Sequence, residues 1–180
     1  MKKCLFVMAV LVCCAVLVAA TSGAAAGAPR VGGEFPAIAI PVPKDRTGMD
    51  YLGLQRGQSF ELSQVKADVV IVEVLSMYCP YCQSEAPKVN RLYEMIERDP
   101  GLKGSVKIIG IAAGNTPLEA DLFKDKYAIP FPVIPDGDFV LHKALGEVRT
   151  PFFIGVVIED RTARVVYSSL GSIEDPDSFL

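Results

Sequence analysis

Apolar runs alternate along the chain with helical patterns and short polar connections. Residues Val69–Leu75 form a β-branched run that is apolar except for Glu73, as expected of a central strand buried on both faces. From Tyr81 to Arg98, apolar residues recur at the three- and four-residue spacing of an amphipathic helix. The pattern therefore predicts a buried strand that leads directly into a long helix.

The rest of the chain predicts further strands and helices after a hairpin-like N-terminal element. We expect strands at Ala37–Ile40, Gln58–Leu62, Val106–Ala112, Phe131–Ile134, Phe152–Ile158 and Arg164–Ser168, and helices at Leu118–Tyr127 and Phe139–Leu145. Residues 44–54 are typical of a loop, and the polar residues 159–162 are typical of a tight turn between the last two strands. This alternation predicts an α/β domain.

The first residues of the chain differ in composition from the rest. Met1-Lys2-Lys3 is positively charged, Cys4–Ala20 is an unbroken apolar run, and small residues suited to cleavage follow. We expect residues 1–26 to be an export signal or, alternatively, an uncleaved membrane anchor. Residues 27–56 then form an N-terminal extension, and residues 57–180 form the main domain.

Charge and cysteine content narrow the possible functions. Without the two lysines of the leader, the chain has 16 basic against 21 acidic residues and a net charge of −5, so we expect no nucleic acid among its partners. Of the five cysteines, Cys4, Cys13 and Cys14 lie in the leader. Only Cys79 and Cys82 remain in the part of the chain expected to work outside the cytoplasm.

These two cysteines form a Cys-Pro-Tyr-Cys motif where the buried strand meets the long helix. A disulfide that closes so short a loop stabilises a fold little. The free N–H groups at a helix N-terminus favour a thiolate, so Cys79 is the predicted nucleophile with a lowered pKa. Cys82, one turn further along, is the predicted resolving thiol. Zinc is a weaker alternative, because the chain has one histidine and no second cysteine pair.

Several positions around the motif resemble the thioredoxin superfamily. Pro87 matches the proline that kinks the family's active-site helix, and Glu73 matches its buried acidic residue. Thr150-Pro151 matches its cis-proline loop. The start of the domain looks like the exported TlpA-like or redoxin branch, which has an N-terminal β-hairpin. The resemblance covers residues 57–170 and implies a thioredoxin-like fold, in which helices flank a central mixed β-sheet.

The resemblance also implies roles for individual residues. Glu73 would handle the proton of Cys82, and the only redox group would be the Cys79–Cys82 disulfide, with no further cofactor and no metal. The residues expected to bind substrate surround the cysteines: Tyr78, Pro80, Tyr81, Thr150 and Pro151. The implied partners are exported proteins with disulfides or thiols, and a membrane-embedded reductase that supplies electrons.

The resemblance therefore predicts a mostly reducing thiol–disulfide oxidoreductase that is periplasmic or otherwise extracytoplasmic. An uncleaved N-terminal segment would tether it to the inner membrane. A disulfide oxidase or isomerase is the near alternative. A copper-binding chaperone on the same fold would use Cys79, Cys82 and His142, although we expect His142 to be a solvated helix residue. A peroxidase is less favoured, because Ser76 stands where peroxiredoxins have threonine.

Three features depart from the family pattern. Tyr78 replaces the familiar tryptophan before the first cysteine, and Pro80-Tyr81 stands between the cysteines instead of Gly-Pro, so a redox potential does not carry over. The sequence ends at residues 175–180, where the family's last helix would begin. Either one face of the sheet is incompletely covered, or the sequence is truncated there.

Overall fold

The computed structural model describes residues 27–179, so the predicted leader, residues 1–26, lies outside the described residues. Among residues 27–179, no helix has both the length and the apolar character needed to cross a membrane. The centre of this part is a five-stranded sheet in the order β5-β4-β3-β6-β7. Its strands are β3 (Val69–Leu75), β4 (Val106–Ala113), β5 (Val133–Asp136), β6 (Phe152–Glu159) and β7 (Thr162–Leu170).

Strand direction confirms the predicted mixed sheet. β3, β4 and β5 run parallel to one another, whereas β6 is antiparallel to β3 and β7 is antiparallel to β6. β3 is paired along both edges, which explains its nearly continuous apolar run. The turn between β6 and β7 contains Asp160 and Arg161, both at positive φ, as expected of a two-residue hairpin loop.

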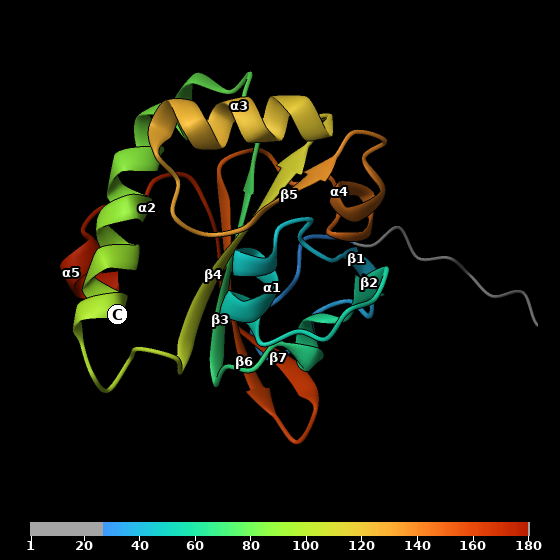
Figure 1. Ribbon diagram of the computed structural model, residues 1–180, viewed down its shortest axis with the longest axis vertical. Helices are drawn as coiled ribbons and strands as arrows, with labels where there is room; N and C mark the ends of the chain where they lie inside the picture. Colours follow the sequence, from blue (N-terminus) through green and yellow to red (C-terminus); the bar gives the residue numbers. More distant parts are fainter. Residues whose placement is uncertain (1–26, 180) are drawn as a thin grey trace, which may run out of the picture.

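Alternate residues of β3 enter two cores on opposite faces of the sheet. The flanking helices are α1 (Arg46–Leu52), α2 (Pro80–Arg98), α3 (Pro117–Tyr127) and α4 (Val140–Ala144). Val70, Val72 and Val74 pack with residues of α1 and α4, whereas Ile71 and Leu75 pack with α2 and α3. Figure 1 shows α2 on one side of the sheet, with α1 and α4 on the other. The α/β prediction is therefore confirmed.

The prediction of a loop at residues 44–54 is wrong, because α1 lies there. Asp45 caps this helix by accepting a hydrogen bond from Gly48 N at 2.6 Å, and Gly53 ends it at φ +64. Both are ordinary helix-boundary signals. The apolar pattern over these seven residues was too short to reveal the helix.

The N-terminal extension differs from a simple hairpin. β1 (Ile40–Pro41) pairs antiparallel with β2 (Ser59–Phe60), but α1 lies between them in the sequence. Both strands are shorter than predicted, and a 3₁₀ turn, η1 (Leu62–Gln64), replaces the end of the second. The extension nevertheless belongs to the main core, because Phe35 and Leu52 are buried in it.

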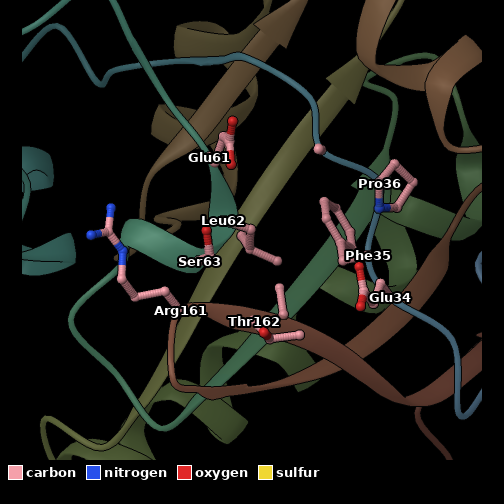
Figure 2. Close-up of a pocket in the computed structure, with 10 residues that line it drawn as sticks. Glu34, Phe35, Pro36, Glu61, Leu62, Ser63, Arg161 and Thr162 are labelled. Atoms are coloured by element: carbon pink, nitrogen blue, oxygen red, sulfur yellow. The ribbon is translucent and has the colours of Figure 1, made fainter.

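Residues 32–35 run along the outer edge of β7. Gly32 N donates to Val165 O at 2.8 Å, and Phe35 N donates to Ala163 O at 2.7 Å. A small hollow of about 120 Å³ lies where this segment meets η1 and the β6–β7 turn (Figure 2). Neither the cysteines nor Pro151 line this hollow, so it is separate from the predicted site.

The last described turn is α5 (Pro176–Phe179), which packs beside α2. Arg91 of α2 forms an ion pair with Asp177 at 2.5 Å. The ring of Phe179 lies edge-on to Phe153 and Tyr167, with ring centroids 6.4 and 5.1 Å away. This turn covers part of the sheet face that α2 leaves open, while Tyr167 stays 38% exposed.

Candidate active site around Cys79

Cys79 lies at the junction of β3 and α2, where the sequence predicts it. It is the N-cap of α2, and Pro80 occupies the first helical turn, where its missing N–H leaves no gap in the hydrogen bonding. The Cys79 sulfur accepts a hydrogen bond from Cys82 N at 3.4 Å and lies 3.3 Å from Thr150 O, to which the thiol donates. The two cysteines and the loop before Pro151 therefore meet at one place.

Two side chains hold the turn that precedes Cys79. Met77 N donates to Asn115 Oδ1 at 2.8 Å, and Met77 O accepts from Gln83 Nε2 at 2.8 Å. Asn115 follows β4 and is fully buried. Sequence reasoning missed both residues. An asparagine two residues after a buried parallel strand was the available signal, because the ends of neighbouring parallel strands meet at one edge of a sheet.

The pKa of Cys79 lies below that of an ordinary thiol. Burial alone would raise the pKa, but hydrogen bonds from the Thr150 side chain and from the backbone N–H of Cys82 outweigh it, with a further contribution from Tyr81 N–H. These donors stabilise the thiolate. Cys79 also remains partly exposed, so a partner can reach its sulfur.

Cys82 lies in a different environment. Its side chain is completely buried against the sheet. Burial raises its pKa to about 12, and the nearby Cys79 sulfur adds to this rise. Both cysteines are free thiols here. The motif thus combines an accessible thiol that ionises readily with a buried thiol that does not.

Glu73 is buried under the motif. It lies on β3 with the same parity as Ile71 and Leu75, so its side chain enters the core that contains Cys82. Only 2% of its surface is exposed, and this burial, together with the negative charge of Glu85, raises its pKa to about 8. A carboxyl group with this pKa gains or loses a proton near neutral pH.

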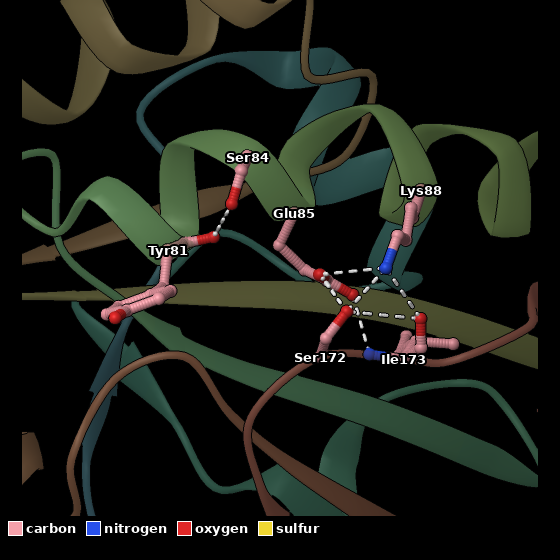
Figure 3. Close-up of polar contacts among 6 residues, drawn as sticks. All are labelled: Tyr81, Ser84, Glu85, Lys88, Ser172 and Ile173. Carbon is pink, nitrogen blue, oxygen red and sulfur yellow. Dashed lines mark hydrogen bonds and ion pairs between the residues drawn. The ribbon is translucent and has the colours of Figure 1, made fainter.

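Glu85 is a second buried acidic residue, which sequence reasoning missed. It is 2% exposed and accepts hydrogen bonds from Ser172 Oγ at 2.5 Å and Ile173 N at 2.6 Å (Figure 3). Lys88 Nζ lies 3.6 Å from the same carboxylate. Its position three residues after Cys82, on the buried face of α2, was the available signal. Glu85 therefore joins α2 to the loop that follows β7.

The predicted substrate-binding residues divide between two hollows. Tyr81, Thr150 and Pro151 line a hollow of about 620 Å³ between α2 and the end of β7. Tyr78 lines a different hollow of about 530 Å³, which Thr150 shares. Pro80 is exposed but is not among the residues lining either hollow. The Thr150–Pro151 peptide bond is cis.

His142 lies on α4, as expected, and it is only partly exposed. Its Nε2 lies 2.8 Å from Val148 O, so this nitrogen carries the proton and donates it to the carbonyl. A copper site that used this nitrogen would have to break the bond. Within residues 27–179, no three His, Cys, Asp or Glu residues are grouped closely enough to hold a metal ion.

Comparison with known proteins supports the same assignment of fold. Thiol-disulfide oxidoreductase ResA of Halalkalibacterium halodurans is 30% identical over 80 residues, which are 44% of this chain and 43% of that protein. The chain thus spans less than half the length of this curated relative.

Two solved structures resemble the fold at 18% sequence identity. The first is the thioredoxin domain of a Bacteroides vulgatus thiol-disulfide oxidoreductase, with a TM-score of 0.61. The match covers 83% of this chain and 95% of the Bacteroides chain. The second is a secreted Mycobacterium tuberculosis disulfide oxidoreductase homologous to E. coli DsbE, with a TM-score of 0.55. The match covers 79% of this chain and 91% of the Mycobacterium chain. These likenesses show the thioredoxin-like fold. Residues 31–169 match the AhpC/TSA family, and the chain therefore belongs to that family.

Proposed function

We propose that the protein is an extracytoplasmic thiol–disulfide oxidoreductase that exchanges electrons with protein substrates through Cys79 and Cys82. The main support is the contrast between the two thiols. Cys79 is partly exposed at a helix N-terminus with a lowered pKa, whereas Cys82 is buried behind it with a raised pKa. The name of the ResA relative agrees with this chemistry.

In the first step, the Cys79 thiolate attacks one sulfur of a substrate disulfide. The substrate's S–S bond breaks, a mixed disulfide forms on Cys79, and the other substrate sulfur leaves as a thiolate that takes up a proton. The thiolate of Cys79 is the nucleophile because its hydrogen-bond donors stabilise the anion. The hollow lined by Tyr81, Thr150 and Pro151 would hold the substrate chain during this attack.

In the second step, Cys82 attacks the Cys79 sulfur and releases the substrate as a thiol. Cys82 must lose its proton first, and its raised pKa makes this the difficult part of the cycle. We assign Glu73 as the group that accepts the proton, because it is buried on the same side of the sheet and has a pKa near 8. Two electrons pass to the substrate, and a Cys79–Cys82 disulfide forms.

The proposed cycle needs a reductant to restore the dithiol, and we assign this role to a dithiol donor in the membrane. Its substrates would be exported proteins with disulfides or thiols. Location outside the cytoplasm is supported by the charged and apolar pattern of residues 1–26 and by the secreted structural relative. No cofactor is needed beyond the cysteine pair.

A disulfide oxidase or isomerase remains the second candidate, because one observation favours it. The hydrogen bonds that lower the pKa of Cys79 also stabilise the reduced form of the motif, which makes its disulfide more oxidising. The reduction potential separates the two directions. A value near that of thioredoxin, about −270 mV, would support reduction, and a value near −120 mV would support oxidation.

The division of roles is tested by trapping the mixed disulfide. Cys82→Ala should accumulate a covalent complex with a model disulfide protein, because no second thiol remains to release the substrate. Cys79→Ala should trap none, since Cys82 is buried. Non-reducing gels and mass spectrometry would identify the linked cysteine. Equal trapping by both variants would contradict the assignment.

A further inference from the structure

A second hollow, of about 530 Å³, adjoins the candidate site. It is lined mostly by residues of the α4 region and of the loop before Pro151, among them Phe139, His142 and Val148, together with Tyr78. Arg149 and Thr150 line both this hollow and the one beside Tyr81. The Cys79 sulfur lies 3.3 Å from Thr150 O, so it is next to a residue that the two hollows share.

Two aromatic side chains are held at this second hollow while staying open to solvent. Tyr78 is 64% exposed, yet its hydroxyl donates to Glu119. Glu119 is itself fixed, because it accepts from Thr116 N at 2.7 Å and Thr116 Oγ1 at 2.8 Å at the start of α3. The Tyr78 ring is therefore directed towards the start of α3.

Phe139 is the second exposed aromatic, at 42% exposure. Its φ of +58° lies in the left-handed region, which a bulky residue rarely adopts. The ring lies over Gly114, where any Cβ would clash with it, and 5.7 Å from the His142 ring. The strained backbone of Phe139 and the missing side chain at Gly114 together allow the ring to lie at the hollow. Backbone strain of this kind often marks functional sites.

The character of the lining indicates what this hollow would bind. Phe139, Val148 and Ala113 supply apolar surface, while Arg149 and Glu147 carry opposite charges at its edge. A site with mixed charge has no preference for one sign of ligand. Exposed aromatic rings instead gain most by covering an apolar side chain.

We propose that this hollow binds an apolar side chain of the same polypeptide whose disulfide reacts with Cys79. The inference rests on the proposed function and extends it, since the substrate would be held on both sides of the reacting sulfur. Tyr81 and Pro151 would contact the chain on one side, and Tyr78 and Phe139 would contact it on the other. An extended chain advances about 3.3 Å per residue, so the bound side chain lies within a few residues of the target cysteine.

The test uses disulfide-linked model peptides in which a residue near the cysteine is either Phe or Ser, placed in turn on each side. The measured quantity is the ratio of kcat/KM for the Phe peptide to that for the Ser peptide. We expect a ratio of about 10 on one side in the wild-type protein, as for burial of one aromatic anchor. Phe139→Asn should reduce this ratio to near 1, and asparagine is chosen because it tolerates the left-handed backbone.

A matched control is Val140→Ser. Val140 is adjacent, 65% exposed and does not line the hollow, so the ratio should stay at its wild-type value. Tyr78→Ser, at an exposed position outside the core, provides a second variant should Phe139→Asn not fold. A wild-type ratio near 1 on both sides, or a ratio unchanged in Phe139→Asn and Tyr78→Ser, would overturn the inference.

Reduction of 2-hydroxyethyl disulfide separates this inference from the proposed function. That compound has no side chain to fill either hollow, so its reduction reports only the cysteine chemistry. If the wild-type protein reduces it but shows no peptide preference, the second hollow is not a substrate site and the proposed function stands. If the wild-type protein reacts with neither disulfide, the proposed function itself fails.

Discussion

At the scale of single residues, the site depends on different surroundings for chemically similar groups. Cys79 and Cys82 are three residues apart, but backbone and side-chain donors lower the pKa of one, while burial raises the pKa of the other. Glu73 and Glu85 are both buried, yet Glu85 accepts two close hydrogen bonds from the loop after β7. Glu85 thus holds α2 to the loop after β7, whereas the proposed proton transfer by Glu73 rests on its burial and raised pKa.

Replacing Glu73 by glutamine should slow release of the mixed disulfide while leaving its formation unchanged. The Glu73 carboxyl is protonated below its pKa of about 8 and becomes a base above it. In the wild-type protein, release should therefore accelerate as the pH rises through 8. In Glu73→Gln this rise should vanish, leaving only the later rise caused by ionisation of Cys82, and the rate at pH 8 should fall by about 10².

Stopped-flow measurement of the two steps from pH 6 to 10 would check this prediction. The formation step serves as the internal control, because it depends on Cys79 alone. An unchanged rate and pH profile for release in Glu73→Gln would remove Glu73 from the mechanism.

At the scale of elements, the position of Cys79 depends on how β3 passes into α2. Asn115 and Gln83 hold the Met77 peptide from both sides, and Cys79 N donates to Ser76 O at 3.0 Å. The sequence pattern predicted the strand, the helix and the position of the cysteine motif between them. It could not identify the hydrogen bond from Met77 N to Asn115, because these two residues meet only after β3 and β4 pair.

Asn115→Ala should lower the free energy of unfolding by about 1–3 kcal/mol, because it leaves Met77 N without its partner. It should also slow the reaction of Cys79, since the turn before the helix is no longer fixed. Asn90→Ala is the matched control. Asn90 Nδ2 donates to Tyr127 O at 2.8 Å, away from the cysteines. This variant should lose less stability, because the buried Oδ1 of Asn90 has no hydrogen-bond partner, and it should leave the reaction rate of Cys79 unchanged.

Urea denaturation and alkylation kinetics would compare the two asparagine variants. A Cys79 rate that is equally affected in both, or in neither, would show that Asn115 supports the fold without positioning the site.

At the scale of the whole molecule, the N-terminal extension and the main domain share one core. Phe35 is 5% exposed in the core that contains β3 and β6, and its backbone pairs with β7. Phe35→Ala should lower the free energy of unfolding by about 3 kcal/mol through the cavity it creates. The Cys79 reaction rate should stay the same, because the residue belongs to the opposite face of the sheet from α2.

Val31→Ala is the control for this substitution, since Val31 is 64% exposed and its truncation should change stability by less than about 0.5 kcal/mol. Thermal unfolding of the three proteins gives the comparison. If Phe35→Ala were as stable as Val31→Ala, the extension would not belong to the folding core.

The sequence predicts the fold better than it predicts the surroundings of the site. Apolar runs located β3 and β4, a helical pattern located α2, and the cysteine spacing pointed to the candidate site between β3 and α2. α1 was missed because seven residues give little periodicity, although Asp45 and Gly53 mark its ends. The contacts of Glu85 were missed because its partner Ile173 is distant in the chain. The bond from His142 to Val148 was missed because it depends on the path of the loop after α4.

The central claim is that the two thiols of one motif have separate roles. Its most direct test is the rate of alkylation at each cysteine of the reduced protein, measured by iodoacetamide labelling and mass spectrometry from pH 5 to 10. We predict that Cys79 reacts with a midpoint below that of a free thiol, and that Cys82 stays unlabelled across this range. Equal rates with the same pH dependence at both cysteines would contradict the account.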